Sequence, residues 1–131
     1  MKRTIVLTAV SIAALSLGTS IAWSQMSAPA KIADTSKGKT LVDAEGMTLY
    51  TFDRDAAPDK SACNGKCASN WPPFVAAADA KTRGDWTVIV RDDGTKQWAY
   101  KGKPLYKWMD DHKPGYVDGD GRNNVWHLAA P

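Results

Sequence analysis

The stretch GMTLYTFDRD at residues 46–55 returns, with substitutions, as GKPLYKWMDD at residues 102–111. The two stretches align without a gap at an offset of 56 residues. The same offset reaches further glycine and proline positions and, after a slip of one residue, a tryptophan. These outer matches pair Gly38 with Gly94, Pro58 with Pro114 and Trp71 with Trp126. Chance would not keep glycine, proline and aromatic positions in one register, so the chain contains two copies of one supersecondary unit.

Each copy consists of short β-branched or aromatic segments separated by turn residues, the pattern of a β-meander. Gly46 and Gly102 occupy equivalent turns, where a tight hairpin requires a positive φ. No window carries an apolar stripe of helical period that is long enough for a sizeable helix. The predicted strands are 30–34, 39–43 and 47–53 in the first copy, and 86–91, 96–100 and 104–109 in the second.

Side chains alternate along a strand, so Tyr50 and Phe52 share one face and Leu49 points to the other. The matching residues Tyr106 and Trp108 behave in the same way in the second copy. Each aromatic ring buries about 150 to 250 Å² of surface. Two units that cannot hide these rings alone would form one core together. The predicted fold is therefore mainly β, with two tandem β-meander repeats packed as one small sandwich-like or barrel-like domain of pseudo-two-fold symmetry.

The N-terminus has the features of a secretory signal peptide. Lys2 and Arg3 precede an apolar stretch that is too short for a comfortable membrane span, and small residues precede Gln25. We therefore expect no stable membrane span after signal cleavage. The expected organisation is a signal peptide at 1–24, an N-terminal linker with a candidate first strand at 25–37, repeat 1 at 38–75, a connecting segment and strand at 76–93, and repeat 2 at 94–131.

The formal charge of the chain is +3, and it falls to +1 when the two basic residues of the signal peptide are removed. A nearly neutral surface without a run of lysine or arginine gives no reason to expect nucleic acid as a partner. Export implies an oxidising compartment, either the periplasm or the exterior, where disulfides persist.

Cys63 and Cys67 are the two cysteines of the chain. Asn64-Gly65 between them favours a tight reversal, which would bring their Cα atoms within the roughly 4.4 to 6.8 Å that a disulfide needs. A structural disulfide is the first interpretation, and a redox pair or a soft-metal site is the second. Covalent haem is disfavoured, because Ala68 stands where haem attachment requires histidine.

The remaining polar motifs each have a structural interpretation beside a functional one. Asp55 and Asp111 follow their aromatic pairs, where a carboxylate organises a loop through backbone N–H groups, bonds a tyrosine hydroxyl, or serves in an acid/base pair. His112 and His127 could join the cysteines in a copper site, although their spacing does not require one. The segment 118–124 resembles a calcium loop but lacks its ligands at two positions.

The aromatic residues suggest a binding surface. Most of them are expected in the core, but an exposed shelf of rings is a common means by which small β domains hold sugars or peptides. The candidates for such a shelf are Trp71, Trp86, Trp98 and Tyr116.

These residues carry a family resemblance. The pattern Tyr-x-(Phe/Trp/Tyr)-x-x-Asp occurs twice, and the run from Cys63 through Cys67 to Phe74 follows the first copy. The chain resembles the bacterial "secreted repeat of unknown function" family over nearly all of residues 38–128. Members of that family are often described as predicted lipoproteins with a Yx(FWY)xxD motif. The motif residues are Tyr50, Phe52, Asp55, Tyr106, Trp108 and Asp111.

The resemblance implies a small envelope domain without an established activity. The chain lacks a cysteine near the signal cleavage site, so the lipoprotein description does not carry over. No nucleophile elbow, phosphate loop or zinc-protease motif is present. We therefore predict an exported, non-enzymatic binding or structural module without a cofactor, whose partner is an envelope component or a small ligand. The alternative is a periplasmic redox or copper-handling protein that uses Cys63 and Cys67.

Overall fold

The computed structural model describes residues 9, 11 and 28–131. Apart from those two positions, the predicted signal peptide lies outside the described residues. The strands are β1 (Lys31–Thr35), β2 (Gly38–Val42), β3 (Tyr50–Phe52), β4 (Trp86–Val90), β5 (Lys96–Tyr100), β6 (Lys103–Pro104) and β7 (Trp126–Leu128). A five-residue helix, α1 (Lys66–Asn70), and a 3-10 turn, η1 (Arg122–Asn124), complete the regular structure.

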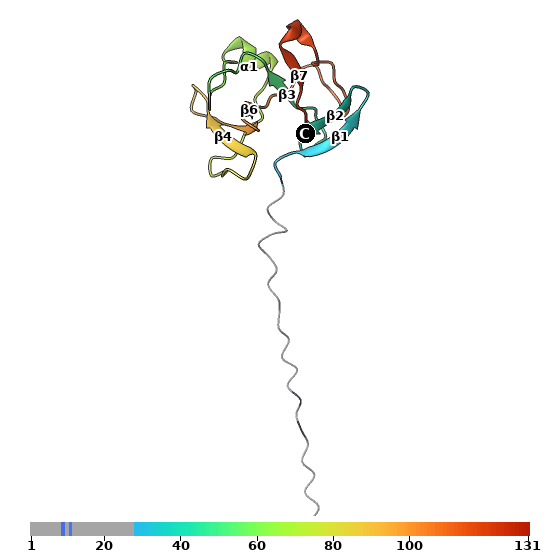
Figure 1. The fold of residues 1–131 in the computed structure, drawn as a ribbon, viewed down its shortest axis with the longest axis vertical. Coiled ribbons are helices and arrows are strands. Elements are labelled where there is room, and N and C mark those ends of the chain that lie inside the picture. Colours follow the sequence, from blue (N-terminus) through green and yellow to red (C-terminus); the bar gives the residue numbers. More distant parts are fainter. Residues whose placement is uncertain (1–8, 10, 12–27) are drawn as a thin grey trace, which may run out of the picture.

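The strands form three small antiparallel sheets, β1-β2, β3-β7 and β4-β5-β6. In Figure 1, β1 and β2 lie with β7 on one side, β4 and β6 lie on the other, and β3 runs between them. The prediction of a mainly β fold built from two repeats is confirmed. The sheets remain separate rather than closing into one barrel.

The two copies share a hydrogen-bonded arrangement in which three chain segments meet in a triangle. In the first triangle Leu41 N donates to Ala129 O, Ala129 N donates to Leu49 O, and Leu49 N donates to Leu41 O, at 2.9, 2.9 and 3.0 Å. In the second, Trp98 N donates to Phe74 O, Phe74 N to Leu105 O, and Leu105 N to Trp98 O, at 2.9, 2.8 and 3.0 Å. The C-terminal segment thus completes the first copy, while the segment around Phe74 completes the second.

The core divides according to the alternation of side chains in the repeated stretch. Leu49 and Leu105, both fully buried, belong to one cluster together with Leu41 and Trp86. The aromatic residues of the motif belong to a second cluster. Its buried members are Tyr50, Cys63, Trp71, Tyr106, Trp108 and Trp126, with Phe52 and Cys67 packed against them. Both copies contribute to both clusters, so neither copy has a core of its own.

The structure departs from the predicted strands near the centre of the molecule. The third strand of the second copy was predicted over 104–109, but β6 ends at Pro104, and Tyr106 then forms single bridges with Tyr50 and Pro73. The chain crosses between partners there, so no continuous ladder forms. Strand β7 and helix α1 lack a local signal in the sequence, because β7 is held by pairing with the distant β3 and α1 is only five residues long.

Candidate functional site

The two copies of the motif form hydrogen bonds with each other at the centre of the molecule. The Tyr50 hydroxyl donates to Asp111 Oδ2 at 2.5 Å, and the Tyr106 hydroxyl donates to Asp55 Oδ2 at 2.6 Å. The tyrosine of each copy therefore bonds the carboxylate of the other. We call this pair of contacts the reciprocal Tyr–Asp bonds.

The backbone between the two tyrosines follows the same two-fold relation. Tyr50 N donates to Tyr106 O at 2.8 Å, and Tyr106 N donates to Tyr50 O at 3.0 Å. Both tyrosines have no exposed surface. The pseudo-two-fold axis passes between them, so the two tyrosines face inward. Among the other motif residues, Phe52 and Asp55 are half-buried and reach the surface.

The second oxygen of each carboxylate organises the loop that follows its strand. Asp55 Oδ1 accepts a bond from Ala62 N at 2.7 Å, and Asp111 Oδ1 accepts one from Asp118 N at 3.0 Å. Ala62 and Asp118 are themselves related by the offset of 56. Each aspartate therefore organises a loop and bonds a tyrosine hydroxyl at once.

Burial sets the ionisation behaviour of these groups. It raises the pKa of the Asp55 carboxyl, although the Tyr106 hydroxyl and Ala62 N oppose the shift. It raises the pKa of Asp111 in the same way, against the Tyr50 hydroxyl. Burial and then the adjacent carboxylates hold the pKa values of Tyr50 and Tyr106 far above the usual range of a phenol. The tyrosines are therefore neutral donors throughout the physiological range.

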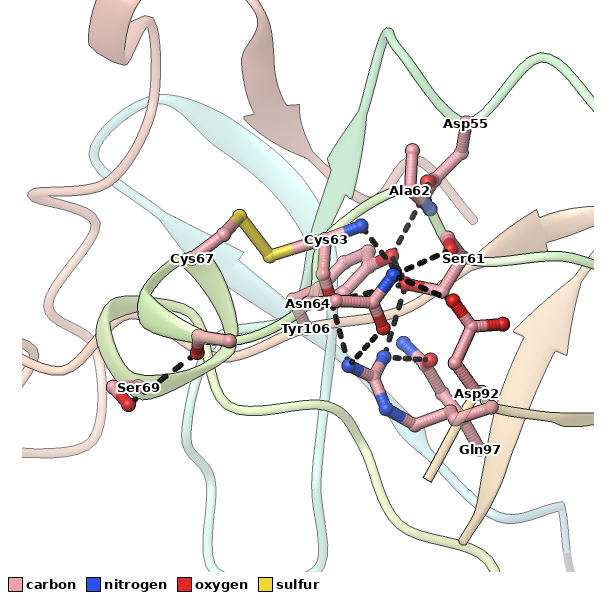
Figure 2. Close-up of a disulfide and its surroundings, with 12 residues drawn as sticks. Asp55, Ser61, Ala62, Cys63, Asn64, Cys67, Ser69, Asp92, Gln97 and Tyr106 are labelled. Atoms are coloured by element: carbon pink, nitrogen blue, oxygen red, sulfur yellow. Dashed lines mark hydrogen bonds between the residues drawn. A yellow bond between two sulfur atoms is a disulfide. The ribbon is translucent and has the colours of Figure 1, made fainter. Parts of the chain in front are cut away.

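The copies differ in what surrounds the tyrosine hydroxyl. Tyr50 accepts a bond from Gly119 N at 3.2 Å. Tyr106 instead lies 2.7 Å from Ser61 Oγ, which also accepts a bond from the Arg91 guanidinium at 3.0 Å. Figure 2 shows this polar cluster beside the disulfide. Through Tyr106, Asp55 thus belongs to an extended polar network, and among the described residues Asp111 has no equivalent network.

Arg91 is the charged centre of that network and is only 5% exposed. Its Nη1 donates to Gln97 Oε1 at 2.7 Å, and its Nη2 donates to Cys63 O at 2.6 Å and Asn64 Oδ1 at 3.4 Å. Within residues 28–131 no carboxylate lies at ion-pairing distance from its guanidinium. Asp55 and Asp93 interact with Arg91 electrostatically at longer range. Arg91 is therefore a buried cation whose hydrogen bonds all go to neutral oxygens.

Cys63 and Cys67 lie at bonding distance, with S–S 2.08 Å and Cα–Cα 5.2 Å, which fits the disulfide expected from the sequence. Cys63 has no exposed surface, whereas Cys67, in α1, is partly exposed. The Cys63 backbone is fixed on both sides, since its N–H donates to Ser61 Oγ and its carbonyl accepts from Arg91. The bond therefore joins a rigid, buried position to an accessible one.

Four aromatic rings stack beside this disulfide in the order Phe52, Trp126, Trp71 and Trp108. Successive ring centroids lie 4.1, 3.7 and 4.3 Å apart, and the first two contacts are nearly parallel. The offsets that relate the copies exchange Phe52 with Trp108 and Trp71 with Trp126, so the stack has the same two-fold symmetry as the tyrosines. The Arg122 guanidinium covers the ring of Trp108 at 4.3 Å and closes that end.

A cavity of about 330 Å³ opens over the other part of the stack, and we call it the ring groove. Rings form part of its lining, together with two asparagine amides, a guanidinium and the accessible cysteine. It is lined by Phe52, Arg54, Cys67, Asn70, Trp71, Asn123, Val125 and Trp126. The ring groove brings together apolar surface, hydrogen-bonding amides, a positive charge and a disulfide.

The other candidate residues do not converge on one place. His127 Nε2 lies 2.7 Å from Asp53 Oδ2, at a second cavity of about 300 Å³, and His112 is exposed near Asp110. Among residues 9, 11 and 28–131 no group of three or more histidine, cysteine or acidic side chains is placed to hold a metal ion. In the segment that resembles a calcium loop, Asp120 Oδ1 accepts a bond from Leu128 N.

The candidate shelf of exposed aromatic rings is not present as a unit. Trp71 and Trp86 are 5% and 8% exposed, so they belong to the core. Trp98 is half-buried and lines a cavity with the segment 79–83, while Tyr116 is 41% exposed. Sequence reasoning also missed Ser61, Arg91 and Gln97, which are all buried. No local pattern could have identified them, because their burial depends on contacts between distant segments.

The protein is a small β domain built from two copies of one unit. The two copies are joined by hydrogen bonds from the tyrosine of each copy to the aspartate of the other. The chain belongs to the family described as "secreted repeat of unknown function", which matches it twice, at residues 31–75 and 87–130. No helix in the described part of the chain is both long and apolar enough to cross a bilayer.

One curated protein is similar to part of the chain. It is a threonine–tRNA ligase of Pyrobaculum arsenaticum (strain DSM 13514 / JCM 11321 / PZ6), 29% identical over 76 residues. These residues are 58% of this chain but only 12% of the ligase, so the similarity covers a small part of that protein. No solved structure matches the chain.

Proposed function

We propose that the chain is an exported, non-enzymatic binding module of the cell envelope. The observation that carries the proposal is that the reciprocal Tyr–Asp bonds use the motif's polar groups inside the protein. Tyr50 and Tyr106 are fully buried, Asp111 is 4% exposed, and Asp55 is half-buried with both carboxylate oxygens hydrogen-bonded within the protein. Catalytic carboxylates need access to a substrate. The repeated motif therefore serves cohesion and leaves the surface for recognition.

The ring groove is the binding site in this proposal. Ligand sites are concave and largely apolar, with a few polar groups that orient the ligand. The half-buried Phe52 and Val125 provide apolar surface above the nearly buried rings of Trp71 and Trp126. Asn70 and Asn123 supply amides that match the hydrogen bonds of a peptide backbone. Arg54 is exposed at this site and adds a positive charge. These features favour an extended, uncharged or acidic polypeptide segment of an envelope component.

Two neighbouring asparagines provide a matched test of the binding site. Asn123 lines the ring groove and Asn124 does not, yet both are exposed and both have positive φ, 51° and 57°. We expect Asn123→Ala to weaken peptide binding about fivefold to tenfold, and Asn124→Ala to leave it unchanged. Isothermal titration with an array-selected peptide gives the affinities.

An equal effect of the two asparagine substitutions would contradict the groove as the binding site. Substrate turnover by the purified protein that disappears in Asp55→Asn or Asp111→Asn would contradict the non-enzymatic assignment. Cell fractionation, with N-terminal sequencing of the product, tests export and distinguishes the periplasm from the exterior. Cleavage before Gln25 is the expected result.

Copper handling by Cys63 and Cys67 is the second candidate function. Thiolates suit Cu(I), and the partial exposure of Cys67 favours this candidate. The sulfurs are bonded to one another, so copper binding requires their prior reduction. Titration of the reduced protein with Cu(I) against a competing chelator tests the candidate. Cu(I) uptake by the unsubstituted protein that is lost in Cys67→Ser would support it, and no uptake would remove it.

A further inference from the structure

The two ends of the disulfide differ in accessibility, and the accessible end lines the ring groove. We propose that Cys63–Cys67 is an exchangeable disulfide, at which a cysteine thiol on a polypeptide held in the ring groove attacks Cys67 and displaces Cys63. This inference rests on the proposed binding function of the groove. It adds the chemical class of the ligand, a thiol-bearing polypeptide, and a covalent step.

Access determines which sulfur is attacked. Thiol–disulfide exchange requires a thiolate to approach one sulfur directly, and its rate depends on which sulfur can be reached. Cys63 is fully buried among the aromatic residues, so an external thiol cannot reach it. Cys67 is partly exposed and belongs to the groove lining. Attack therefore takes place at Cys67.

A positive charge at the ring groove favours the incoming sulfur. Arg54 lines the ring groove with Cys67 and, within the described residues, makes no ion pair, so its charge is available to an approaching thiolate. Nearby cations stabilise thiolates.

The step balances without a further reagent. The thiolate of the ligand forms a bond to the Cys67 sulfur, the bond between Cys67 and Cys63 breaks, and its electron pair leaves with Cys63 as a thiolate. The product is a mixed disulfide between the ligand and Cys67. The total number of disulfide bonds and of thiolates is unchanged, so the exchange captures the ligand covalently and reversibly.

Two peptides that differ in one atom test the inference. The oxidised protein is incubated with acetyl-Ala-Ala-Cys-Ala-Ala-amide, with its serine analogue, and with N-acetylcysteine, then quenched in acid and mapped by mass spectrometry. We expect an adduct of the cysteine peptide on Cys67, formed about tenfold faster than the N-acetylcysteine adduct, because groove binding raises the effective concentration of the thiol. Asn123→Ala should remove this advantage, and Asn124→Ala should retain it.

The outcomes separate this inference from the proposed function. Binding of the serine peptide without any adduct of the cysteine peptide overturns the exchange and leaves the binding site standing. An adduct on Cys63, or equal rates for the peptide and N-acetylcysteine, also overturns the inference. Absence of both binding and adduct overturns it together with the binding of this peptide class.

Discussion

At the scale of single residues, Tyr50 illustrates why the motif is repeated. Its hydroxyl donates to Asp111 and accepts from Gly119, and the ring has no exposed surface. Tyr50→Phe would remove a hydrogen bond to a charged acceptor and leave a buried N–H without its partner. We expect a loss of about 2 to 3 kcal/mol in the free energy of unfolding, measured by urea denaturation.

Tyr116 is the matched control for this substitution, because it is 41% exposed. Tyr116→Phe should change the free energy of unfolding by less than about 0.5 kcal/mol. A similarly small effect of Tyr50→Phe would show that the reciprocal Tyr–Asp bonds contribute no net stability.

The pH dependence of stability distinguishes Asp111 from Asp43. Burial raises the pKa of Asp111 above its ordinary value of 3.8, so the folded state takes up its proton more readily than the unfolded state. The contribution of Asp111 to stability therefore grows as the pH falls from neutrality through its folded pKa. Asp43 behaves in the opposite way, because hydrogen bonds from Lys107 and Met47 N overcome burial and lower its pKa.

Two asparagine variants test these opposite pH dependences of stability. The loss of stability caused by Asp111→Asn should be larger near pH 4 than at pH 7, whereas the loss caused by Asp43→Asn should be largest at pH 7 and should shrink as the pH falls through 3.8. Thermal unfolding across this range measures both trends. Parallel profiles for the two variants would refute the assignment.

At the scale of elements, Gly119 determines how closely the loop before η1 approaches the ring stack. A Cβ at this position would lie 2.8 Å from Tyr50 Cζ and 2.9 Å from Trp71 Cη2, both of which are ring atoms in a packed core. We expect Gly119→Ala to destabilise the protein by about 1 to 3 kcal/mol through overpacking. Chemical denaturation, with tryptophan fluorescence as the probe, measures the effect.

Gly38 provides the comparison, because a Cβ there would meet nothing within 4 Å but the residue has φ +106°. Gly38→Ala should therefore perturb stability through backbone strain of about 1 kcal/mol and leave the tryptophan emission maximum unchanged. Gly119→Ala should shift that maximum, because Trp71 must move. An unshifted maximum would contradict the close approach.

The disulfide is also an element-scale feature, because it closes a loop of only five residues. In the chain-entropy model such a loop contributes about 2 kcal/mol. The double variant Cys63→Ala with Cys67→Ala should therefore remain folded at 25 °C with a correspondingly lower midpoint in urea. Circular dichroism of the variant checks the fold, and an unfolded spectrum would indicate that the bond is essential to the scaffold.

At the scale of the whole molecule, each copy depends on the other. Strand β3 of the first copy pairs with β7 of the second, and Trp71 stacks on Trp126. A fragment of residues 28–75 or 76–131 alone would leave its rings exposed and its tyrosine without an acceptor. We expect both fragments to give collapsed amide dispersion in ¹H–¹⁵N spectra, and dispersion to return when they are mixed. Independent folding of either fragment would contradict the shared core.

The duplication itself was readable from the chain. The offset of 56 residues, the turn glycines and the alternation that separates Leu49 from Tyr50 together predicted a mainly β domain with two copies that bury one another's rings. These features are local, because strand alternation and turn geometry are set by neighbouring residues. The motif residues were also identifiable, since they recur in one register.

Only the tertiary structure decided which residues meet. The exchange of Tyr50 and Tyr106 between copies, the burial of Arg91 beside Cys63, and the meeting of Cys67 with the ring groove join segments that are far apart in the chain. An arginine or a serine in a loop has the same local pattern whether it is solvated or buried. Burial depends on packing across the whole fold, so the sequence determined the repeated scaffold, and the folded chain alone determined the site.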